Sequence, residues 1–190
     1  MWELKEPKPV KLIVGILASD ERGLAAARGS LVSALGASDL ASAVWTFDQT
    51  DYYAEQIGPH ILRQFVTIER LIDPGHLAAV KHRTNAIERH LATTLGSSFP
   101  RPVNLDPGII EPSKLVLAST KNFAHRIYIG NRMYAEVTLL FDKGQWRFTP
   151  YTYPDYQTPH YLDFFSQVRE KLKTQLASNQ QPRTNNQEPC

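Results

Sequence analysis

Short runs of apolar residues alternate with polar segments in the first part of the chain. Residues 11–18 read Lys-Leu-Ile-Val-Gly-Ile-Leu-Ala, and residues 61–68 are rich in β-branched and aromatic side chains. A run of this length with few polar interruptions is typical of a strand that is buried on both faces. With a third run at 43–47, the pattern predicts three strands in this part of the chain.

Two segments show the three- and four-residue spacing of helices. After Ser19, which can cap a helix, one face carries Leu24, Leu31, Val32 and Leu35, and Gly36 can end the segment. Near the C-terminus, Thr158-Pro159 opens a segment whose apolar residues share one face: Tyr161, Phe165, Val168, Leu172 and Leu176. We therefore expect one helix after the first strand and another at the end of the folded region.

The clearest helical pattern lies between these two segments. Asp73 suits the N-cap, Pro74 suits the first helical position, and Gly96 follows the last turn. Thr84 interrupts an otherwise apolar stripe made of Leu77, Val80, Ile87, Leu91 and Leu95. The spacing predicts a helix over residues 74–95.

After Pro100 the pattern becomes mostly that of strands. Gly130-Asn131 and Asp142-Lys143-Gly144 are turn sequences that commonly join neighbouring antiparallel strands. They divide the region into expected strands at 102–106, 114–119, 125–129, 132–141 and 145–149.

The order of these elements predicts an α+β fold. Strand, helix, strand, strand, helix, strand is the order of a ferredoxin-like βαββαβ core, with helices on one face of a mostly antiparallel sheet. A β-hairpin extension and a C-terminal helix would complete a single domain over residues 1–177. Residues 178–190 are almost entirely polar, and we expect them to form a disordered C-terminal tail.

The composition excludes some classes of binding partner but does not indicate a function. The formal net charge of +2 is too small to indicate a nucleic-acid or anionic-membrane partner. The only cysteine is Cys190, so we expect neither a disulfide within the chain nor a cysteine-based metal site. The chain shows no signal-peptide pattern and no apolar run of membrane-spanning length. We expect a soluble, cytoplasmic protein and leave its oligomeric state open.

The segment Asn104-Leu-Asp106-Pro-Gly108 has two interpretations. Asp106 precedes a proline, which keeps its backbone out of the helical region, and Gly108 permits a tight turn. As a turn that ends a strand, the segment needs no function, because Asp106 can bond its own backbone. Alternatively, Asn104 and Asp106 lie two positions apart on one strand face and both point into a site.

His125 and Glu136 are predicted to face each other across a hairpin. If Gly130-Asn131 forms a two-residue turn, counting back from it places His125 opposite Glu136. A neighbouring carboxylate orients an imidazole and raises its basicity, which suits acid–base chemistry. The alternative is an exposed ion pair of little energetic value, and a shift of one residue in the turn would remove the pairing.

Polar residues also follow two of the expected strands. Asp48 and Thr50 come directly after residues 43–47, and Lys121 follows residues 114–119. Strand-end loops often carry binding groups on a rigid scaffold, and a lysine there suits an anionic group. A capped turn and an ordinary surface loop are the alternative interpretations.

Two further groups are candidates for ligand contacts. In the second helix, Asn85 shares one face with Lys81 and Glu88, an arrangement that is usually a solvated face. Around Pro154, aromatic and acidic residues could wall a pocket for a flat ring, or they could pack beneath a loop: Tyr153, Asp155 and Tyr156.

Several familiar nucleotide and metal motifs are missing from the sequence. There is no Gly-x-x-x-x-Gly-Lys-Ser/Thr phosphate loop, no Gly-x-Gly-x-x-Gly dinucleotide fingerprint, and no His-Glu-x-x-His zinc motif. A hard divalent cation held by carboxylates stays open as a cofactor, and the cofactor is otherwise unknown.

A series of linked motifs resembles one bacterial and archaeal family, named domain of unknown function 4416, over roughly residues 6–176. The motifs include Phe47-Asp48-Gln-Thr50-Asp-Tyr52-Tyr53, Thr84-Asn85-x-x-Glu88, Asn104-Leu-Asp106-Pro-Gly108, Lys114 to Lys121, His125-Arg126-Ile-Tyr128, Tyr134-Ala-Glu136-Val-Thr138 and Tyr153-Pro-Asp155-Tyr156. The resemblance implies no activity and transfers no catalytic residue. Some members carry a "GTP-binding protein" label, which this sequence does not support, because the phosphate loop and an Asn-Lys-x-Asp motif are both missing.

We therefore expect a small enzyme that acts on a small polar, anionic metabolite in a single pocket. The expected catalytic groups, which could also hold a divalent cation, are Asp48, Asp106, His125 and Glu136. The expected ligand-binding groups are Thr50, Asn85, Asn104, Lys121, Tyr153, Asp155 and Tyr156. A non-catalytic, nucleotide- or ligand-binding regulatory module is the first alternative, and a protein-interaction module with exposed tyrosines is the second.

Overall fold

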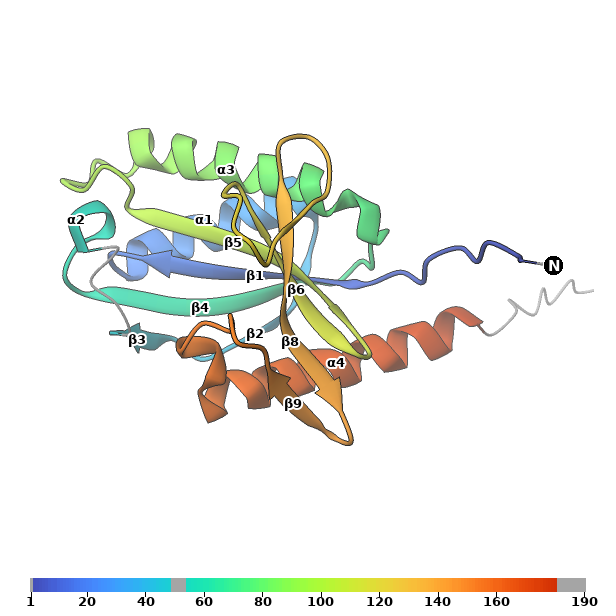
Figure 1. The fold of residues 1–190 in the computed structure, drawn as a ribbon. Coiled ribbons are helices and arrows are strands. Elements are labelled where there is room, and N and C mark those ends of the chain that lie inside the picture. The colour runs from blue at the N-terminus through green and yellow to red at the C-terminus, as the bar shows by residue number, and fades with distance from the viewer. Residues whose placement is uncertain (1, 49–53, 181–190) are drawn as a thin grey trace, which may run out of the picture.

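A sheet of nine strands organises the described part of the chain, residues 2–48 and 54–180 of this computed structural model (Figure 1). Every pairing between these strands is antiparallel. The order is β2-β4-β1-β5-β6-β8-β7, with β3 also beside β4 and β9 beside β8. The strands are β1 (Lys11–Ala18), β2 (Ser38–Ala41), β3 (Trp45–Phe47), β4 (Ile61–Ile68), β5 (Val103–Glu111), β6 (Lys114–Ser119), β7 (Ile127–Tyr128), β8 (Tyr134–Asp142) and β9 (Gln145–Phe148).

The helices connect these strands in the order that the sequence predicts. They are α1 (Glu21–Leu35), α2 (Ala54–Ile57), η2 (Pro74–His76), α3 (Leu77–Thr94), η3 (Asp155–Gln157) and α4 (Pro159–Gln180). Because α1 joins β1 to β2 and α3 joins β4 to β5, the strand order β2-β4-β1-β5 is compatible with the expected split β-α-β core. The single-domain, antiparallel α+β fold is confirmed.

Several element boundaries differ from the sequence prediction. The cap of α1 is Asp20 rather than Ser19: the extended Asp20 backbone lets its Oδ1 accept a hydrogen bond from the Gly23 amide at 2.7 Å. The strand expected at 43–47 is β3, which begins only at Trp45, and the additional strand β2 precedes it; both pair with β4. Helix α4 continues to Gln180, past residue 178, where we expected the tail to begin.

Both faces of the sheet are covered, each by its own apolar cluster. Alternate residues of β1 point to opposite faces, so Val14 packs with Leu24 of α1 and Leu91 of α3. Ile13, on the other face, packs in a largely aromatic cluster with Phe165 of α4. Figure 1 shows α1 and α3 together on one side of the sheet and α4 on the other. The face that carries α4 is the one into which the candidate site opens.

Strand β5 corrects the expectation of a turn at Asp106-Pro107-Gly108. The strand runs without a break through these residues to Glu111, and all of them pair with β1. Strand β6 pairs with β5 only from Gly108 to Glu111. At Gly108 a Cβ atom would lie 2.5 Å from the Val116 carbonyl oxygen, so this glycine allows the close approach of β6. On the N-terminal side of Gly108 in β5, the two strands diverge.

The β7–β8 hairpin has a three-residue loop instead of the expected two-residue turn. The Ile129 amide donates to the Met133 carbonyl, and Tyr128 pairs with Tyr134. Gly130, Asn131 and Arg132 lie between these bonded positions, all with positive φ, so the hairpin register shifts by one residue from our count.

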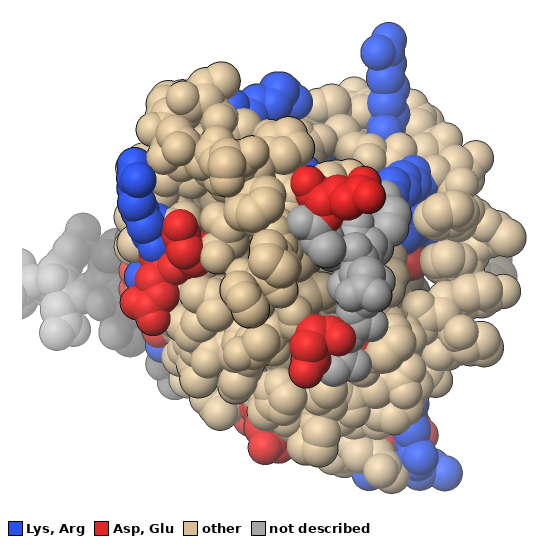
Figure 2. All heavy atoms as spheres, turned by 90° about the vertical axis from the view of Figure 1, so that its left-hand side faces the viewer, with Lys and Arg blue, Asp and Glu red and all other residues tan. Residues whose placement is uncertain are grey.

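The surface seen from the left-hand side of Figure 1 carries few charged side chains. Lys, Arg, Asp and Glu side chains form small, scattered groups there, some with both charges side by side, among uncharged residues (Figure 2). None of the helices in the described ranges combines the length and the apolar character needed to cross a membrane.

An ion pair between the buried Lys11 and the partly buried Asp39 joins β1 to the edge of the sheet. Lys11, with no exposed surface, donates to Asp39 Oδ2 at 2.6 Å and to the Gln175 side chain of α4 at 3.0 Å. Burial lowers the pKa of Lys11, and hydrogen bonds from Lys11 and Thr67 lower the pKa of Asp39 against the opposing effect of burial. The pair therefore links β1, the β2 edge and α4.

We predict that Lys11→Met destabilises the protein by about 3 kcal/mol, because it leaves Asp39 charged without its buried partner. Thr67 and Lys171 still contact Asp39, at 2.6 and 3.9 Å, which places the loss at the lower end of the range for buried pairs. Urea unfolding measures the change, with exposed Lys8→Met as the control. A loss below about 0.5 kcal/mol, as at surface sites, would show that the pair contributes nothing.

Candidate functional site

A cleft of about 600 Å³ opens where β5 and β6 diverge. Its lining residues come from β3, β4, α3, β5, β6, β8, the segment around η3, and the loops that precede β5 and β7. Five cationic side chains and three carboxylates share this lining with aromatic and aliphatic groups. The sequence-predicted residues that it brings together are Asn104, Asp106, Lys121, Glu136, Tyr153, Asp155 and Tyr156.

Three of the predicted residues that the structure describes are not among those that line the cleft. Asp48 follows β3 directly, and its charge contributes to a raised pKa of about 12 for Tyr161, whose main cause is burial. Asn85 is half-buried on α3, one turn after the lining residue Lys81, and does not itself line the cleft. His125 contacts the lining residue Glu136 without lining the cleft itself. Thr50 lies outside the described residues.

Helix α3 braces the part of β5 that β6 does not pair. Glu88 Oε1 accepts a hydrogen bond from the Leu105 amide at 2.8 Å, and Lys81 Nζ donates to the Leu105 carbonyl, also at 2.8 Å. These two side chains therefore satisfy the backbone groups that a neighbouring strand would otherwise satisfy. Glu88 Oε2 also accepts two hydrogen bonds from Arg101, at 2.6 and 2.9 Å. Burial raises the pKa of Glu88, although Lys81 and Arg101 oppose the rise.

Asp106 is the most accessible carboxylate in the cleft. Its side chain is 28% exposed, whereas those of Glu136 and Asp155 are 4% and 8% exposed. The Asn104 amide donates to Asp106 Oδ2 at 2.6 Å, and Lys81 Nζ lies 3.6 Å from Asp106 Oδ1. The hydrogen bond from Asn104 thus orients the Asp106 carboxylate through Oδ2, and Oδ1 lies next to the ammonium group of Lys81. This arrangement suits acid–base chemistry.

The other end of the cleft is held by a network around Arg126. Its guanidinium contacts both oxygens of Glu136, at 3.3 and 3.4 Å, and donates to Ser119 Oγ and Tyr153 Oη, each at 2.6 Å. His125 Nε2 lies 2.5 Å from Glu136 Oε2, and its ring stacks on Tyr151 with a centroid distance of 4.2 Å. Both Glu136 oxygens are therefore occupied by cationic or imidazole partners.

The contact between His125 and Glu136 is the predicted one, but the reason differs. The shifted register would place Val137, not Glu136, opposite residue 125 if β7 extended that far. Strand β7 begins only at Ile127, so His125 lies in the preceding loop and reaches Glu136 from there. The hairpin turn does not create this pair.

Arg63 and Asp155 form the buried floor of the cleft. Arg63 Nη2 donates to Asp155 Oδ2 at 3.0 Å, and both residues are more than nine-tenths buried. Burial raises the pKa of Asp155 against the opposing charge of Arg63. Burial also raises the pKa of Tyr153 to about 12, and that of Tyr156 well above its usual value, so both phenols stay protonated at neutral pH.

Sequence reasoning missed four cations of the cleft: Arg63, Lys81, Arg101 and Arg126. Arg63 was detectable as a lone charge inside the apolar run 61–68. We interpreted the helix face with Lys81 and Glu88 as solvated, and this interpretation is wrong, because these side chains are 4% and 7% exposed. Thr84, which interrupts the apolar stripe, was the available signal that polar residues of this helix are buried.

In the described ranges, residues 2–48 and 54–180, no group of three or more His, Cys, Asp or Glu side chains is placed to hold a metal ion. Each cleft carboxylate instead has at least one cationic neighbour.

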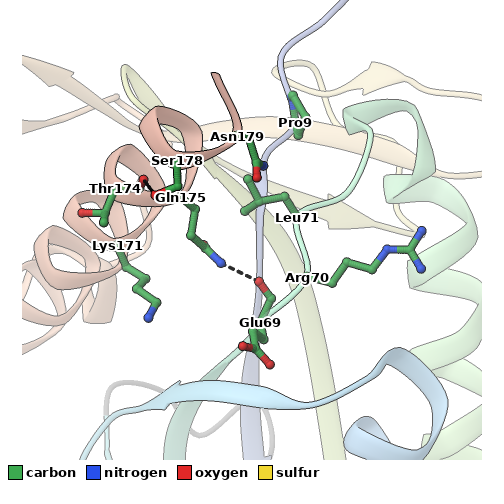
Figure 3. Close-up of a pocket in the computed structure, with 9 residues that line it drawn as sticks. All are labelled: Pro9, Glu69, Arg70, Leu71, Lys171, Thr174, Gln175, Ser178 and Asn179. Carbon is green, nitrogen blue, oxygen red and sulfur yellow. Dashed lines mark hydrogen bonds between the residues drawn. The ribbon is translucent and has the colours of Figure 1, made fainter. Parts of the chain in front are cut away.

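A second cavity, of about 430 Å³, lies between α4 and the segment that follows β4. Gln175 reaches across it and donates to the Glu69 carbonyl at 2.7 Å (Figure 3). Its side-chain oxygen also accepts the hydrogen bond from Lys11 described above. The polar groups of this cavity hold α4 against the sheet, so the cleft at β5 is the stronger candidate site.

The chain belongs to the family described as Domain of unknown function (DUF4416), which matches residues 8–172. This confirms the resemblance in the sequence. No curated protein and no solved structure matches the chain.

We predict that Glu88→Ala lowers the free energy of unfolding by about 1–3 kcal/mol, because the buried Leu105 amide loses its acceptor. Glu88→Gln keeps an acceptor oxygen at the same place and is the matched control. Hydrogen exchange followed by NMR should show faster exchange of the Leu105 amide in Glu88→Ala only. Equal protection of that amide in both variants would contradict the bracing role of Glu88.

Proposed function

We propose that this protein is a small enzyme whose active site is the cleft between β5 and β6. Its family has no described function, so the proposal is based on the geometry of the cleft. The observation that supports it is the accessible carboxylate of Asp106 inside a cleft with five cationic side chains. Such a lining favours a small anionic metabolite, because the ligand's charge compensates cations that are already partly removed from water.

In this proposal Asp106 is the proton-transfer group. Asn104 fixes one of its oxygens, and Lys81 supplies a nearby positive charge. Glu136 and His125, which the sequence suggested as catalytic, become supporting residues, because they bind each other and Glu136 also binds Arg126. Lys121 and Arg126 on the β6 side would attract the charge of the metabolite.

Aromatic side chains complete the proposed pocket. Phe123, Tyr153 and Tyr156 line the cleft together with Leu117 and Ala118. This apolar wall would pack on the carbon skeleton of the metabolite while the cations bind its charge. The proposal keeps the cytoplasmic location and the ferredoxin-like description of the core that the sequence suggests, and it requires no nucleic-acid or membrane partner.

A non-catalytic binding module would use the same cleft and differ only in the absence of turnover. A protein-interaction role draws support from a different surface. Ile127 and Tyr128 of the edge strand β7 are 74% and 57% exposed, and Tyr151 nearby is 55% exposed. Exposed apolar side chains at a sheet edge can mark a contact surface.

We expect an anionic metabolite from a panel of sugar phosphates, dicarboxylates and nucleotides to raise the melting temperature. A ligand at a hundred times its Kd stabilises by about 2.7 kcal/mol, which corresponds to roughly 5–10 °C for a chain of this size. Mass spectrometry of the incubated ligand then separates turnover from binding.

With that ligand, Asp106→Asn should retain binding and lose turnover by about a hundredfold or more, because it removes the proton-transfer group. Asp163→Asn, an exposed position on α4, is the matched control. Turnover at the wild-type rate in Asp106→Asn would refute the assigned role, and a bound ligand that is never altered would favour the binding module.

A further inference from the structure

Arg63 is an unusual residue for its position. It lies in the middle of β4, a strand that is otherwise almost entirely buried, and only 3% of its own surface is exposed. Its guanidinium lies among the rings of Phe47, Phe65 and Tyr156, with distances of 5.2, 5.2 and 5.8 Å to the ring centroids. Such contacts favour a cation but satisfy none of its N–H groups.

Within residues 2–48 and 54–180, one nitrogen of this guanidinium has a hydrogen-bond partner. Nη2 donates to Asp155, whereas Nε and Nη1 are buried and have no partner among the residues that the structure describes. The Arg126 guanidinium, also lining the cleft, uses all three of its nitrogens for hydrogen bonds. Because buried N–H groups are nearly always paired, the open nitrogens of Arg63 indicate a partner outside the residues that the structure describes.

A second unpaired donor borders the same space. The Tyr156 hydroxyl is buried and likewise lacks a partner within the described part of the chain. Burial raises its pKa well above the usual value, so it carries its proton at neutral pH and can donate a hydrogen bond. Arg63 and Tyr156 both line the cleft.

Gly15 of β1 makes room for this guanidinium. A Cβ atom at that position would lie 2.8 Å from Arg63 Nη1 and 3.0 Å from the Phe65 ring. In the sheet, Gly15 pairs with Asp106 on one side and with Phe65 on the other. A glycine in a buried strand thus keeps one open nitrogen of Arg63 next to the strand position of Asp106.

The charge of Arg63 is secure in this environment. Burial by itself would lower the pKa of Arg63, but the electrostatic effects of Tyr156 and Asp155 outweigh it and the pKa is raised. A planar guanidinium with open N–H groups matches the oxygens of carboxylates and phosphates.

We propose that the floor of the cleft is an oxyanion receptor, in which Arg63 Nε and Nη1 and the Tyr156 hydroxyl bind the carboxylate or phosphoryl group of the ligand. Asp155 keeps Nη2 and holds the guanidinium in place, so ligand binding breaks no existing hydrogen bond. This inference rests on the proposed function, since it assigns the anionic group of the metabolite to a defined place beside Asp106.

Inorganic phosphate and acetate, titrated calorimetrically at constant ionic strength, test the receptor and distinguish its two ligand classes. We expect at least one of them to bind to the full chain. Arg63→Lys keeps a positive charge opposite Asp155 but lacks the open N–H groups, so affinity should fall by about tenfold or more. Arg28→Lys, which alters an arginine bonded to Gln64, is the matched control and should bind as wild type does.

Two further variants keep the test decisive if Arg63→Lys fails to fold. Tyr156→Phe removes one donor, and Gly15→Ala displaces Arg63 Nη1 without touching its charge; each should weaken binding of the same anion. Wild-type affinity in all folded variants, or no binding of either anion, overturns the receptor.

The outcomes also separate this inference from the proposed enzyme. Asp106-dependent turnover of a metabolite with no effect of Arg63, Tyr156 or Gly15 variants would overturn the receptor and leave the enzyme standing. Anion binding that depends on Arg63, without any Asp106-dependent turnover, would support the receptor and refute the enzyme.

Discussion

The pairing of the Leu105 backbone is the constraint on which the rest of the site depends. Strand β6 does not pair with the part of β5 that precedes Gly108. The amide and carbonyl of Leu105 therefore need other partners inside the protein. Glu88 and Lys81 of α3 supply these partners. Their hydrogen bonds take the place of those from β6, and β5 continues as a strand where β6 no longer pairs with it. A cleft can therefore open inside a sheet without leaving an unpaired edge.

The same brace determines the chemistry of the cleft. Side chains of neighbouring residues in a strand point to opposite faces, so a fixed Leu105 places Asn104 and Asp106 together on the open face. Lys81 then has two partners, the Leu105 carbonyl and the Asp106 carboxylate. Structure and charge are thus coupled, because one ammonium group holds the backbone and balances the carboxylate beside it.

Much of this fold follows from patterns that the sequence carries locally. Residues 11–18 and 61–68 are strands, and the helix that Asp73 precedes is in place, because apolar periodicity and caps act over a few residues. The continuation of β5 through Asp106-Pro107-Gly108 was not predictable in this way. Pro107 lacks an N–H group and would normally end a strand, but here it lies directly before Gly108, where the pairing with β6 begins. The predicted register of the β7–β8 hairpin was wrong because the loop has three residues. Arg132 has a positive φ as well as Gly130 and Asn131, which the sequence did not indicate. Among the predicted site residues, Asn104, Asp106 and Glu136 lie in strands and line the cleft, whereas Asp48, which directly follows a strand, does not. The contributions of Arg63 and Lys81 depend on burial that only the tertiary structure creates.

Two glycines in buried strands show how the local and tertiary requirements conflict. Glycine is unfavourable in a strand because it loses more backbone entropy than other residues and packs no side chain. Gly108 is nevertheless required where the Val116 carbonyl approaches, and Gly15 is required where the Arg63 guanidinium lies. The first allows β6 to approach β5 just before the cleft opens, and the second keeps a buried cation at its floor. Because neither position has a positive φ or lies in a turn, space alone explains both glycines, and the space in each case is used to build the cleft.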